Sequence, residues 1–316
     1  MKKVLVTSRS FGKVSDEPLN ILKEAGLEVT LMGADFDEEK FKAAVVEYDA
    51  LIIGAHKFYP EDMAKCEKLQ IICKHGAGLD NIYLDEAKAQ GVRVTNVPAM
   101  NANAVADLAV AHMLNVCRGV SLCSANVKSG QWKTYIGKDM YHKTLGLIGF
   151  GNIAKNVARR AHGFSMDVIA YDPYVKEIPE EFKEYVRLGT LDEVIENGDF
   201  VSIHVPLTEE TRDMFNKESM GRMKEGAYLI NTGRGGIVNE ADLYEAVKSG
   251  HLGGAALDVT ASEPIEADNP LLTLDNVVIT PHIGMYSFEA INAVSVVCAK
   301  NVVKQLAGET PDFIVV

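Results

Sequence analysis

Three polar side chains with complementary chemistry each follow a short apolar run that predicts a buried strand: Arg234, Glu263 and His282. Ligands of an open parallel sheet bind at the carboxyl ends of its strands, so we expect the three to share one edge. A His moves a hydroxyl proton near neutral pH, a carboxylate orients and charges the ring, and an Arg holds a substrate carboxylate or carbonyl. Hydride transfer to or from a 2-hydroxy acid requires these groups.

A glycine-rich turn near the middle of the chain predicts dinucleotide binding. Residues 149–154 have the pattern G-x-G-x-x-A, between a strand expected at 144–148 and a helix expected at 153–161. The first glycine permits a tight turn, the second lets the backbone approach a pyrophosphate, and the third small residue keeps helix and strand close. Asp172, which ends the next expected strand, is placed to hold the ribose hydroxyls and repel a 2′-phosphate. We therefore expect NAD as the cofactor, contacted by Gly149, Gly151, Asn152 and Ile153.

Each candidate residue also has an ordinary interpretation. A single loop His is usually structural or exposed, Arg234 between glycines could be a loop cation, and Glu263 before a proline could be a turn residue. Because they occur together beyond a dinucleotide motif, the functional interpretation is favoured. No His/Cys pair has ligand spacing, so we expect no metal site. The remaining histidines include His112, expected to be packed on an apolar helix, and three at surfaces or helix ends, namely His142, His162 and His251.

The composition argues against several classes of protein. The chain has 316 residues, 47% hydrophobic and 24% charged, as in soluble globular proteins, and is long enough for two domains. Its net charge of −12 argues against a nucleic-acid partner. Five cysteines without framework spacing predict reduced thiols in a cytoplasmic protein. No apolar run approaches the ~20 residues of a membrane span, and none near Met1 is long enough for a signal peptide, so we expect no membrane partner.

Strands and helices are expected to alternate along nearly the whole chain, which predicts the α/β class with parallel sheets covered on both faces. We expect two doubly wound parallel-sheet domains. A Rossmann NAD-binding domain, 100–287, is inserted into a flavodoxin-like substrate domain, 1–99 and 288–316. The longest apolar helical pattern, 102–118, joins the two and is expected to be a buried interdomain or oligomer helix.

Motifs spread over nearly the whole chain resemble those of the D-2-hydroxyacid dehydrogenases, specifically the phosphoglycerate-dehydrogenase-like branch. The resemblance is carried by residues 75–82, 96–98 through Asp107, 149–154, 171–173, 204–208, 231–235, Asp258 with Glu263-Pro264, and 280–284.

The resemblance implies a role for each matching position. It makes Arg234, Glu263 and His282 catalytic and lets the Ala77–Gly78 backbone hold the substrate carboxylate. Many members are homodimers through the second domain, so a homodimer is expected. The cofactor site would also include His204, Pro206, Thr211, Thr232 and Asp258, the last contacting the nicotinamide amide.

The sequence departs from the family pattern at three points. Phosphoglycerate dehydrogenases often carry an Arg after the strand matching 50–53, reaching the substrate phosphate, and Gly54-Ala55 stand there instead. The chain ends at Val316, so we expect neither the regulatory extension of the longer enzymes nor serine feedback through one. The acidic helix residue, usually Glu, is Asp107. Three nearby cations could take over the phosphate contact, namely His56, Lys57 and Lys74.

The expected function is NAD-dependent hydride transfer on a small D-2-hydroxy or 2-keto acid, with 3-phosphoglycerate as the favoured substrate. The nearest alternative is a glyoxylate or hydroxypyruvate reductase. A different class of protein also stays open, namely a non-catalytic NAD-sensing binding protein, because some relatives with this fold act as transcriptional corepressors.

Overall fold

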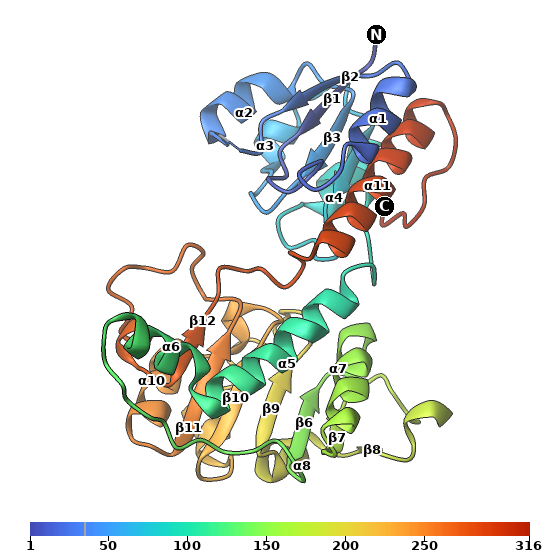
Figure 1. Ribbon diagram of the computed structural model, residues 1–316. Helices are drawn as coiled ribbons and strands as arrows, with labels where there is room; N and C mark the ends of the chain where they lie inside the picture. Colours follow the sequence, from blue (N-terminus) through green and yellow to red (C-terminus); the bar gives the residue numbers. More distant parts are fainter. Residues whose placement is uncertain (35) are drawn as a thin grey trace. The chain divides into compact units, whose positions relative to one another are not determined.

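The computed structural model describes residues 1–34 and 36–316 and divides the chain into two compact units (Figure 1). Unit 1 comprises Met1–Asn101 and Met285–Val316, and unit 2 comprises Ala102–Gly284. Both are built on parallel sheets, which confirms the predicted α/β class.

Unit 1 has a five-stranded parallel sheet in the order β2-β1-β3-β4-β5, the flavodoxin-like order. The strands are β1 (Lys3–Val6), β2 (Glu28–Leu31), β3 (Ala50–Ile53), β4 (Ile71–Lys74) and β5 (Arg93–Thr95). The helices are α1 (Glu17–Glu24), α2 (Glu38–Val45), α3 (Pro60–Met63), α4 (Leu84–Ala89) and α11 (Phe288–Leu306).

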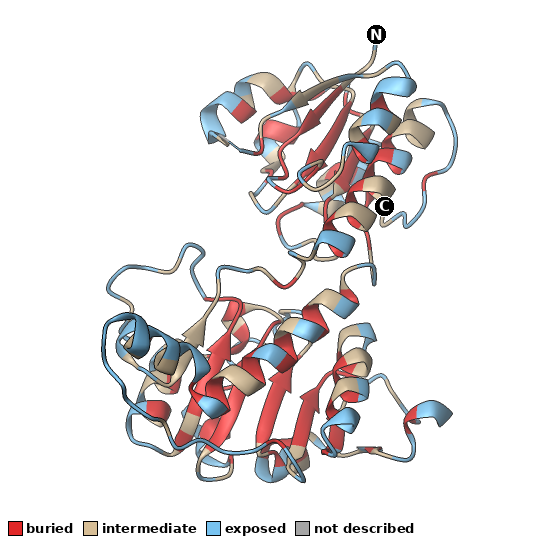
Figure 2. Ribbon diagram, in the orientation of Figure 1, coloured by how far each residue is buried: buried red, intermediate tan, exposed pale blue. Residues whose placement is uncertain are grey.

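The central strands of unit 1 are apolar on both sides because both faces of the sheet are covered. Along β3, Ala50 and Ile52 pack in the core under α1 and α11, whereas Leu51 and Ile53 pack in the core under α2, α3 and α4. Figure 2 shows this sheet as a buried layer. The end of the chain returns to the outer edge of β5, where the Val315 N–H donates to the Val94 carbonyl at 2.8 Å.

Unit 2 has a seven-stranded parallel sheet in the order β12-β11-β10-β9-β6-β7-β8, the Rossmann order with one added strand at the β12 edge. The strands are β6 (Thr144–Ile148), β7 (Asp167–Tyr171), β8 (Val186–Leu188), β9 (Phe200–Ile203), β10 (Ala227–Asn231), β11 (Leu252–Leu257) and β12 (Val277–Ile279). The α-helices are α5 (Ala102–Arg118), α6 (Val120–Lys128), α7 (Asn152–Gly163), α8 (Leu191–Asn197), α9 (Lys217–Gly221) and α10 (Glu240–Lys248), and short 3-10 turns lie at Glu180–Phe182, Gly235–Ile237 and Pro270–Thr273.

Polar side chains mark where several helices begin. Asp37, Asn239 and Ser287 each accept a hydrogen bond from a first-turn N–H of α2, α10 and α11. Thr190 and Glu193 form a capping box at the start of α8. Each of these N-cap residues stands directly before the first turn of the helix that it starts.

One α-helix and one strand of unit 2 were not expected. Helix α6 follows Gly119, whose φ of 59° breaks the helical path after α5, and none of its residues is buried. A helix without a buried face shows little apolar periodicity, which is why the sequence did not reveal it. Strand β8 has three residues and a single buried one, Val186, so its pattern is too short to detect.

No single helix among the described residues is long and apolar enough to cross a membrane. Helices α5 and α6 reach that length and composition only as a pair, with a bend of 64° between them. In α5, the residues that face the sheet are buried, including Ala106, Ala109 and Met113. All five cysteines are unpaired, and four of them are buried.

Candidate active site

Glu263 and His282, predicted to act together, are in direct contact in unit 2. The Nδ1 atom of His282 lies 2.8 Å from Oε2 of Glu263, and the side chains are 47% and 40% exposed. The Thr260 N–H donates to the other carboxylate oxygen at 3.4 Å. The contact fixes the ring by Nδ1 and leaves Nε2 as the nitrogen that can exchange a proton with a substrate.

The ionisation of Glu263 suits this pairing. Partial burial raises the pKa of the Glu263 carboxyl, but the hydrogen bond with His282 and the charges of His282 and Arg234 outweigh it, leaving the pKa below its usual value. The group is therefore a carboxylate at neutral pH.

The loop that carries His282 is anchored to the buried carboxylate of Asp258 at the end of β11. Oδ1 accepts from the Ile283 N–H at 2.8 Å, and Oδ2 accepts from the Gly284 N–H at 2.7 Å. The Thr280 hydroxyl adds a bond to Oδ1 at 2.6 Å. These bonds hold His282 at a φ of 53°, in the left-handed region that non-glycine residues seldom adopt.

Arg234 is brought towards the same pair by the turn after β10. The Cβ that a side chain would add at Gly235 lies 2.0 Å from the backbone of Thr260, so only glycine lets the two loops approach this closely. Buried Asn231 fixes the turn, since its amide donates to the Arg234 carbonyl at 2.9 Å and its Oδ1 accepts from Gly233 N–H at 2.9 Å. Arg234 lies close enough to lower the pKa of Glu263 by its charge.

The glycine turn has the geometry that a pyrophosphate requires. Gly149 has a φ of 90°, and a Cβ there would lie 2.9 Å from the His204 carbonyl. A Cβ at Gly151 would meet no atom within 4 Å, so the backbone is open on that side. Within the described chain no side chain caps the start of α7 at Gly151, which leaves the first N–H groups, those of Asn152 and Ile153 included, available to an anion. The residues present fit a bound dinucleotide.

Asp172 lies at the carboxyl end of β7, beside the glycine turn. Its Oδ2 accepts from the Phe150 N–H and its Oδ1 from the Tyr174 N–H, both at 2.9 Å. Each carboxylate oxygen retains a lone pair for a ribose hydroxyl.

The other predicted cofactor residues lie on the loops after β9 and β10. The two ring nitrogens of His204 contact Ser202 Oγ at 2.9 Å and Thr232 Oγ1 at 3.3 Å. Burial lowers the pKa of His204 to about 3, so the ring is neutral. Thr211 donates to the Pro206 carbonyl at 2.7 Å, which shapes the loop beside it.

The predicted substrate loop lies in unit 1, after β4. Gly76 has a φ of 142°, and the Ala77 carbonyl accepts from Asn96 Nδ2 at 2.8 Å. Before this loop, buried His75 contacts Ser8 Oγ through Nδ1 at 3.0 Å and Ser295 Oγ through Nε2 at 2.8 Å. The loop with Ala77 and Gly78 is thus tied both to the turn after β1 and to α11.

The three cations considered for a substrate phosphate differ in their surroundings. His56 is held by Thr7 Oγ1 at 2.8 Å, and burial lowers its pKa to about 4, so it carries no charge at neutral pH. Lys74 donates to the Gly54 carbonyl at 2.6 Å and to Asn81 Oδ1 at 2.8 Å. Lys57 is exposed.

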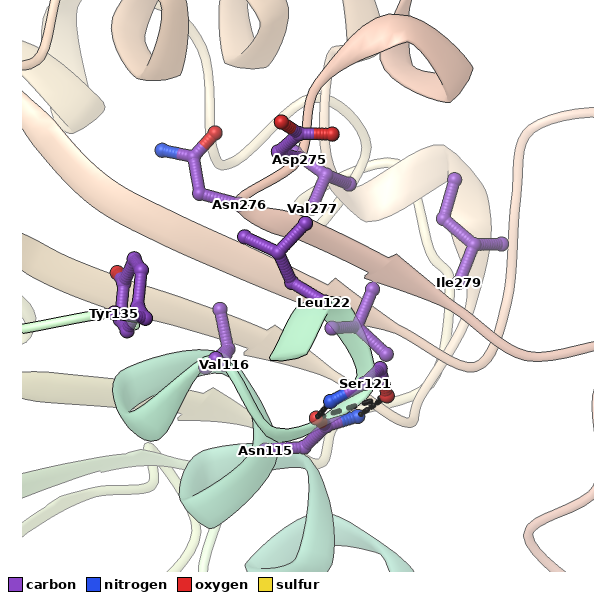
Figure 3. A pocket seen from close by; sticks show the side chains of 11 residues that line it. Asn115, Val116, Ser121, Leu122, Tyr135, Asp275, Asn276, Val277 and Ile279 are labelled. Carbon is purple, nitrogen blue, oxygen red and sulfur yellow. Dashed lines mark hydrogen bonds between the residues drawn. The ribbon is translucent and has the colours of Figure 1, made fainter. Parts of the chain in front are cut away.

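A cavity of about 240 Å³ lies in another part of unit 2 (Figure 3). It is lined by the end of α5, the start of α6 and strand β12, and Asn115 and Ser121 are hydrogen bonded to each other beside it. None of the predicted catalytic residues contributes to it.

The supporting roles of Asn231 and His112 were not predicted from the sequence. Asn231 holds the turn of Arg234, and its position as the last residue of an otherwise apolar strand was a usable signal. Thr280 donates its only hydroxyl proton to Asp258, so His112 Nε2, at 3.1 Å from Thr280 Oγ1, must be the donor of that pair. His112 was expected only to be packed, and its contact with Thr280 needed the tertiary structure.

The fold and this site define a dinucleotide-binding α/β protein with a histidine–carboxylate pair at the edge of its sheet. Residues 110–284 match the model of the D-isomer specific 2-hydroxyacid dehydrogenase NAD-binding domain. The chain belongs to this family, and unit 2 contains its NAD-binding domain.

Individual relatives give the extent of the similarity. The chain is 41% identical to hydroxypyruvate reductase of Thermotoga maritima, covering 90% of this chain and 93% of that protein. It is 38% identical to D-3-phosphoglycerate dehydrogenase of Methanocaldococcus jannaschii, covering 100% of this chain but 59% of that longer protein. The solved structure of the TT0316 protein from Thermus thermophilus has a TM-score of 0.92 at 36% identity, covering 99% of this chain and 100% of that one.

The charge of Asp172 should set the choice of cofactor. A unit charge at ~5 Å in an effective dielectric constant of ~20 costs a 2′-phosphate ~3 kcal/mol, and salt reduces this. We expect kcat/KM to favour NAD over NADP by roughly tenfold or more, and Asp172→Ser to lose that preference. Asp172→Asn, which keeps the shape without the charge, should lose it too. Equal kcat/KM for both cofactors in the wild type would refute this.

The carboxylate of Glu263 should set the pH dependence. Reduction of a keto acid needs His282 protonated, and oxidation of a hydroxy acid needs it neutral. Glu263→Gln keeps a polar group at Nδ1 but removes the carboxylate charge that would offset an imidazolium formed during the reaction. The reductive rate should therefore fall at a lower pH than in the wild type, and the oxidative reaction should stay active to lower pH. Profiles of kcat/KM in both directions test this, and an unmoved or upward-shifted profile would contradict it.

Proposed function

We propose that the chain is an NAD-dependent D-2-hydroxyacid dehydrogenase acting on 3-phosphoglycerate and its keto acid. The observation that carries the proposal is the contact between His282 and an ionised Glu263, whose pKa the charge of Arg234 also lowers. The similarity to an archaeal D-3-phosphoglycerate dehydrogenase over the whole of this chain supports the substrate.

Each residue has a defined part in the proposed reaction. When bound at the glycine turn, NAD supplies the site that accepts or returns the hydride. His282 takes the hydroxyl proton during oxidation and returns it during reduction, while Glu263 holds the ring and offsets its charge. Arg234 orients the substrate carboxylate or carbonyl by charge-assisted hydrogen bonds. The Ala77 and Gly78 backbone binds the substrate carboxylate, and Lys57 and Lys74 supply positive charge for a phosphate.

Hydroxypyruvate or glyoxylate reduction is the second candidate. It is favoured by the 41% identity with the Thermotoga hydroxypyruvate reductase, whose length matches this chain much better than that of the archaeal dehydrogenase. The five unpaired cysteines support a cytoplasmic location, since disulfides persist mainly in oxidising compartments.

Turnover separates the proposed enzyme from a non-catalytic NAD sensor. With a panel of 2-hydroxy and 2-keto acids, with and without phosphate, the wild type should convert phosphoglycerate with NAD. His282→Asn should lower kcat in both directions by roughly 10²–10⁴-fold because the proton-transfer group is gone, while NADH binding stays largely intact. NADH binding without turnover of any panel member would instead identify a sensor.

We also propose a homodimer formed through unit 2. Segment 131–139 packs against the end of α5, where a Cβ at Gly119 would lie 2.6 Å from the Tyr135 ring. The same segment exposes 89% of Trp132 and 97% of Ile136, close in sequence to α6, none of whose residues is buried. Large apolar side chains exposed together favour a partner surface.

Charged substitutions in this segment should weaken the dimer. Each large apolar side chain contributes ~1.5–3 kcal/mol when buried, so Trp132→Asp with Ile136→Asp should raise the dimer dissociation constant by roughly a hundredfold or more. Analytical ultracentrifugation over a concentration series measures this. Tyr174→Asp, at a 91% exposed aromatic elsewhere in unit 2, is the control. An unchanged dissociation constant in the double variant would exclude this surface.

A further inference from the structure

The loop after β1, residues 7–13, presents one charged side chain from an otherwise buried turn in unit 1. Ser8, Ser10 and Phe11 are buried, and Arg9 between them is exposed. The turn stands at the carboxyl end of β1, the edge of the parallel sheet at which ligands bind.

This turn is fixed to the predicted substrate loop. Ser8 Oγ contacts His75 Nδ1 at 3.0 Å, and the ring of Phe11 meets the ring of His75 edge-on at 5.8 Å. His75 directly precedes Gly76, Ala77 and Gly78. It is held on its other side by Ser295 Oγ at 2.8 Å. Arg9 therefore directly follows Ser8, and Ser8 contacts His75, the residue immediately before the substrate loop.

Two glycines leave room for the backbone of this turn at the carboxyl end of the sheet. A Cβ at Gly33, after β2, would lie 2.3 Å from the Ser8 carbonyl oxygen. A Cβ at Gly54, after β3, would lie 3.1 Å from the Ser8 Cα. The backbone of Ser8 and Arg9 thus occupies space that side chains at these positions would otherwise fill, which fixes the place from which Arg9 extends.

The guanidinium of Arg9 has no protein partner within the described part of the chain. Within residues 1–34 and 36–316, no hydrogen bond or ion pair engages its guanidinium, whereas Lys74 at the same edge already donates to the Gly54 carbonyl and Asn81. Lys57 is exposed at this edge as well. In a protein with a net charge of −12, two exposed cations at one sheet edge form a local anion-attracting surface.

We propose that Arg9 is a specificity-determining residue that binds an anionic group, a phosphate foremost, at the end of the substrate remote from the reacting carbon. This inference rests on the proposed function and extends it. A guanidinium presents two parallel N–H groups that match two phosphate oxygens, which an ammonium cannot do. Lys57 adds charge to the subsite, and Arg9 supplies its directional contact.

Binding and turnover of a matched pair of acids test the proposal. Calorimetry on the full chain with saturating NAD measures the affinities of 3-phospho-D-glycerate and D-glycerate, and NADH absorbance measures kcat/KM for both. Arg9→Ala should weaken binding of the phosphorylated acid by about ten- to a hundredfold and leave D-glycerate nearly unchanged. Arg9→Lys should recover part of the loss because it keeps the charge but not the fork. Lys57→Ala should have a smaller effect than Arg9→Ala.

The matched control is Arg93→Ala. It removes an exposed Arg from the amino end of β5, whereas Arg9 lies at the carboxyl end of the same parallel sheet. It should leave both affinities unchanged. Equal weakening for both acids in Arg9→Ala, an equal effect of Arg93→Ala, or wild-type binding that ignores the phosphate would each overturn the proposal. If Arg9→Ala loses phosphate selectivity in binding but the wild type turns over neither acid, the proposed function fails while the role of Arg9 stands.

Discussion

The buried carboxylate of Asp258 organises the loop on which the proposed chemistry depends. It accepts hydrogen bonds from Thr280, Ile283 and Gly284, and the backbone carbonyl of Asp258 accepts from the His282 N–H at 2.9 Å. A hydrogen bond to a charged group contributes about 1.5–3 kcal/mol, so this set can hold His282 in an unfavourable backbone conformation. None of these bonds involves the imidazole ring of His282, so the ring remains free to contact Glu263.

Close approach at glycines is the second constraint that shapes the site. At Gly235 the turn of Arg234 meets Thr260, and at Gly149 the cofactor turn meets the loop after β9. A side chain at either place would collide with backbone, which cannot move without shifting a strand end. The glycines therefore determine how near the functional loops lie to one another, although none of them takes part in the chemistry.

Burial separates the structural histidines from the catalytic candidate. His75 and His204 each contact two hydroxyl oxygens, and burial lowers the pKa of both to about 3. These rings are neutral and cross-link neighbouring elements. His282 is nearly half exposed and pairs with a carboxylate, an environment in which a ring can change its charge during a reaction. Residue type alone would not distinguish the three.

The sequence by itself determined the α/β class, the alternating elements and the cofactor motif. These depend on local patterns, namely apolar runs and the spacing of glycines around residue 149. The sequence also placed Arg234, Glu263 and His282 after strands. Only the tertiary structure decided that Glu263 meets His282 at 2.8 Å, that His112 supports Thr280, and that the loop of Arg9 is joined to His75. These contacts join residues between 19 and 168 positions apart, and such distances close only when the strands have been ordered in a sheet.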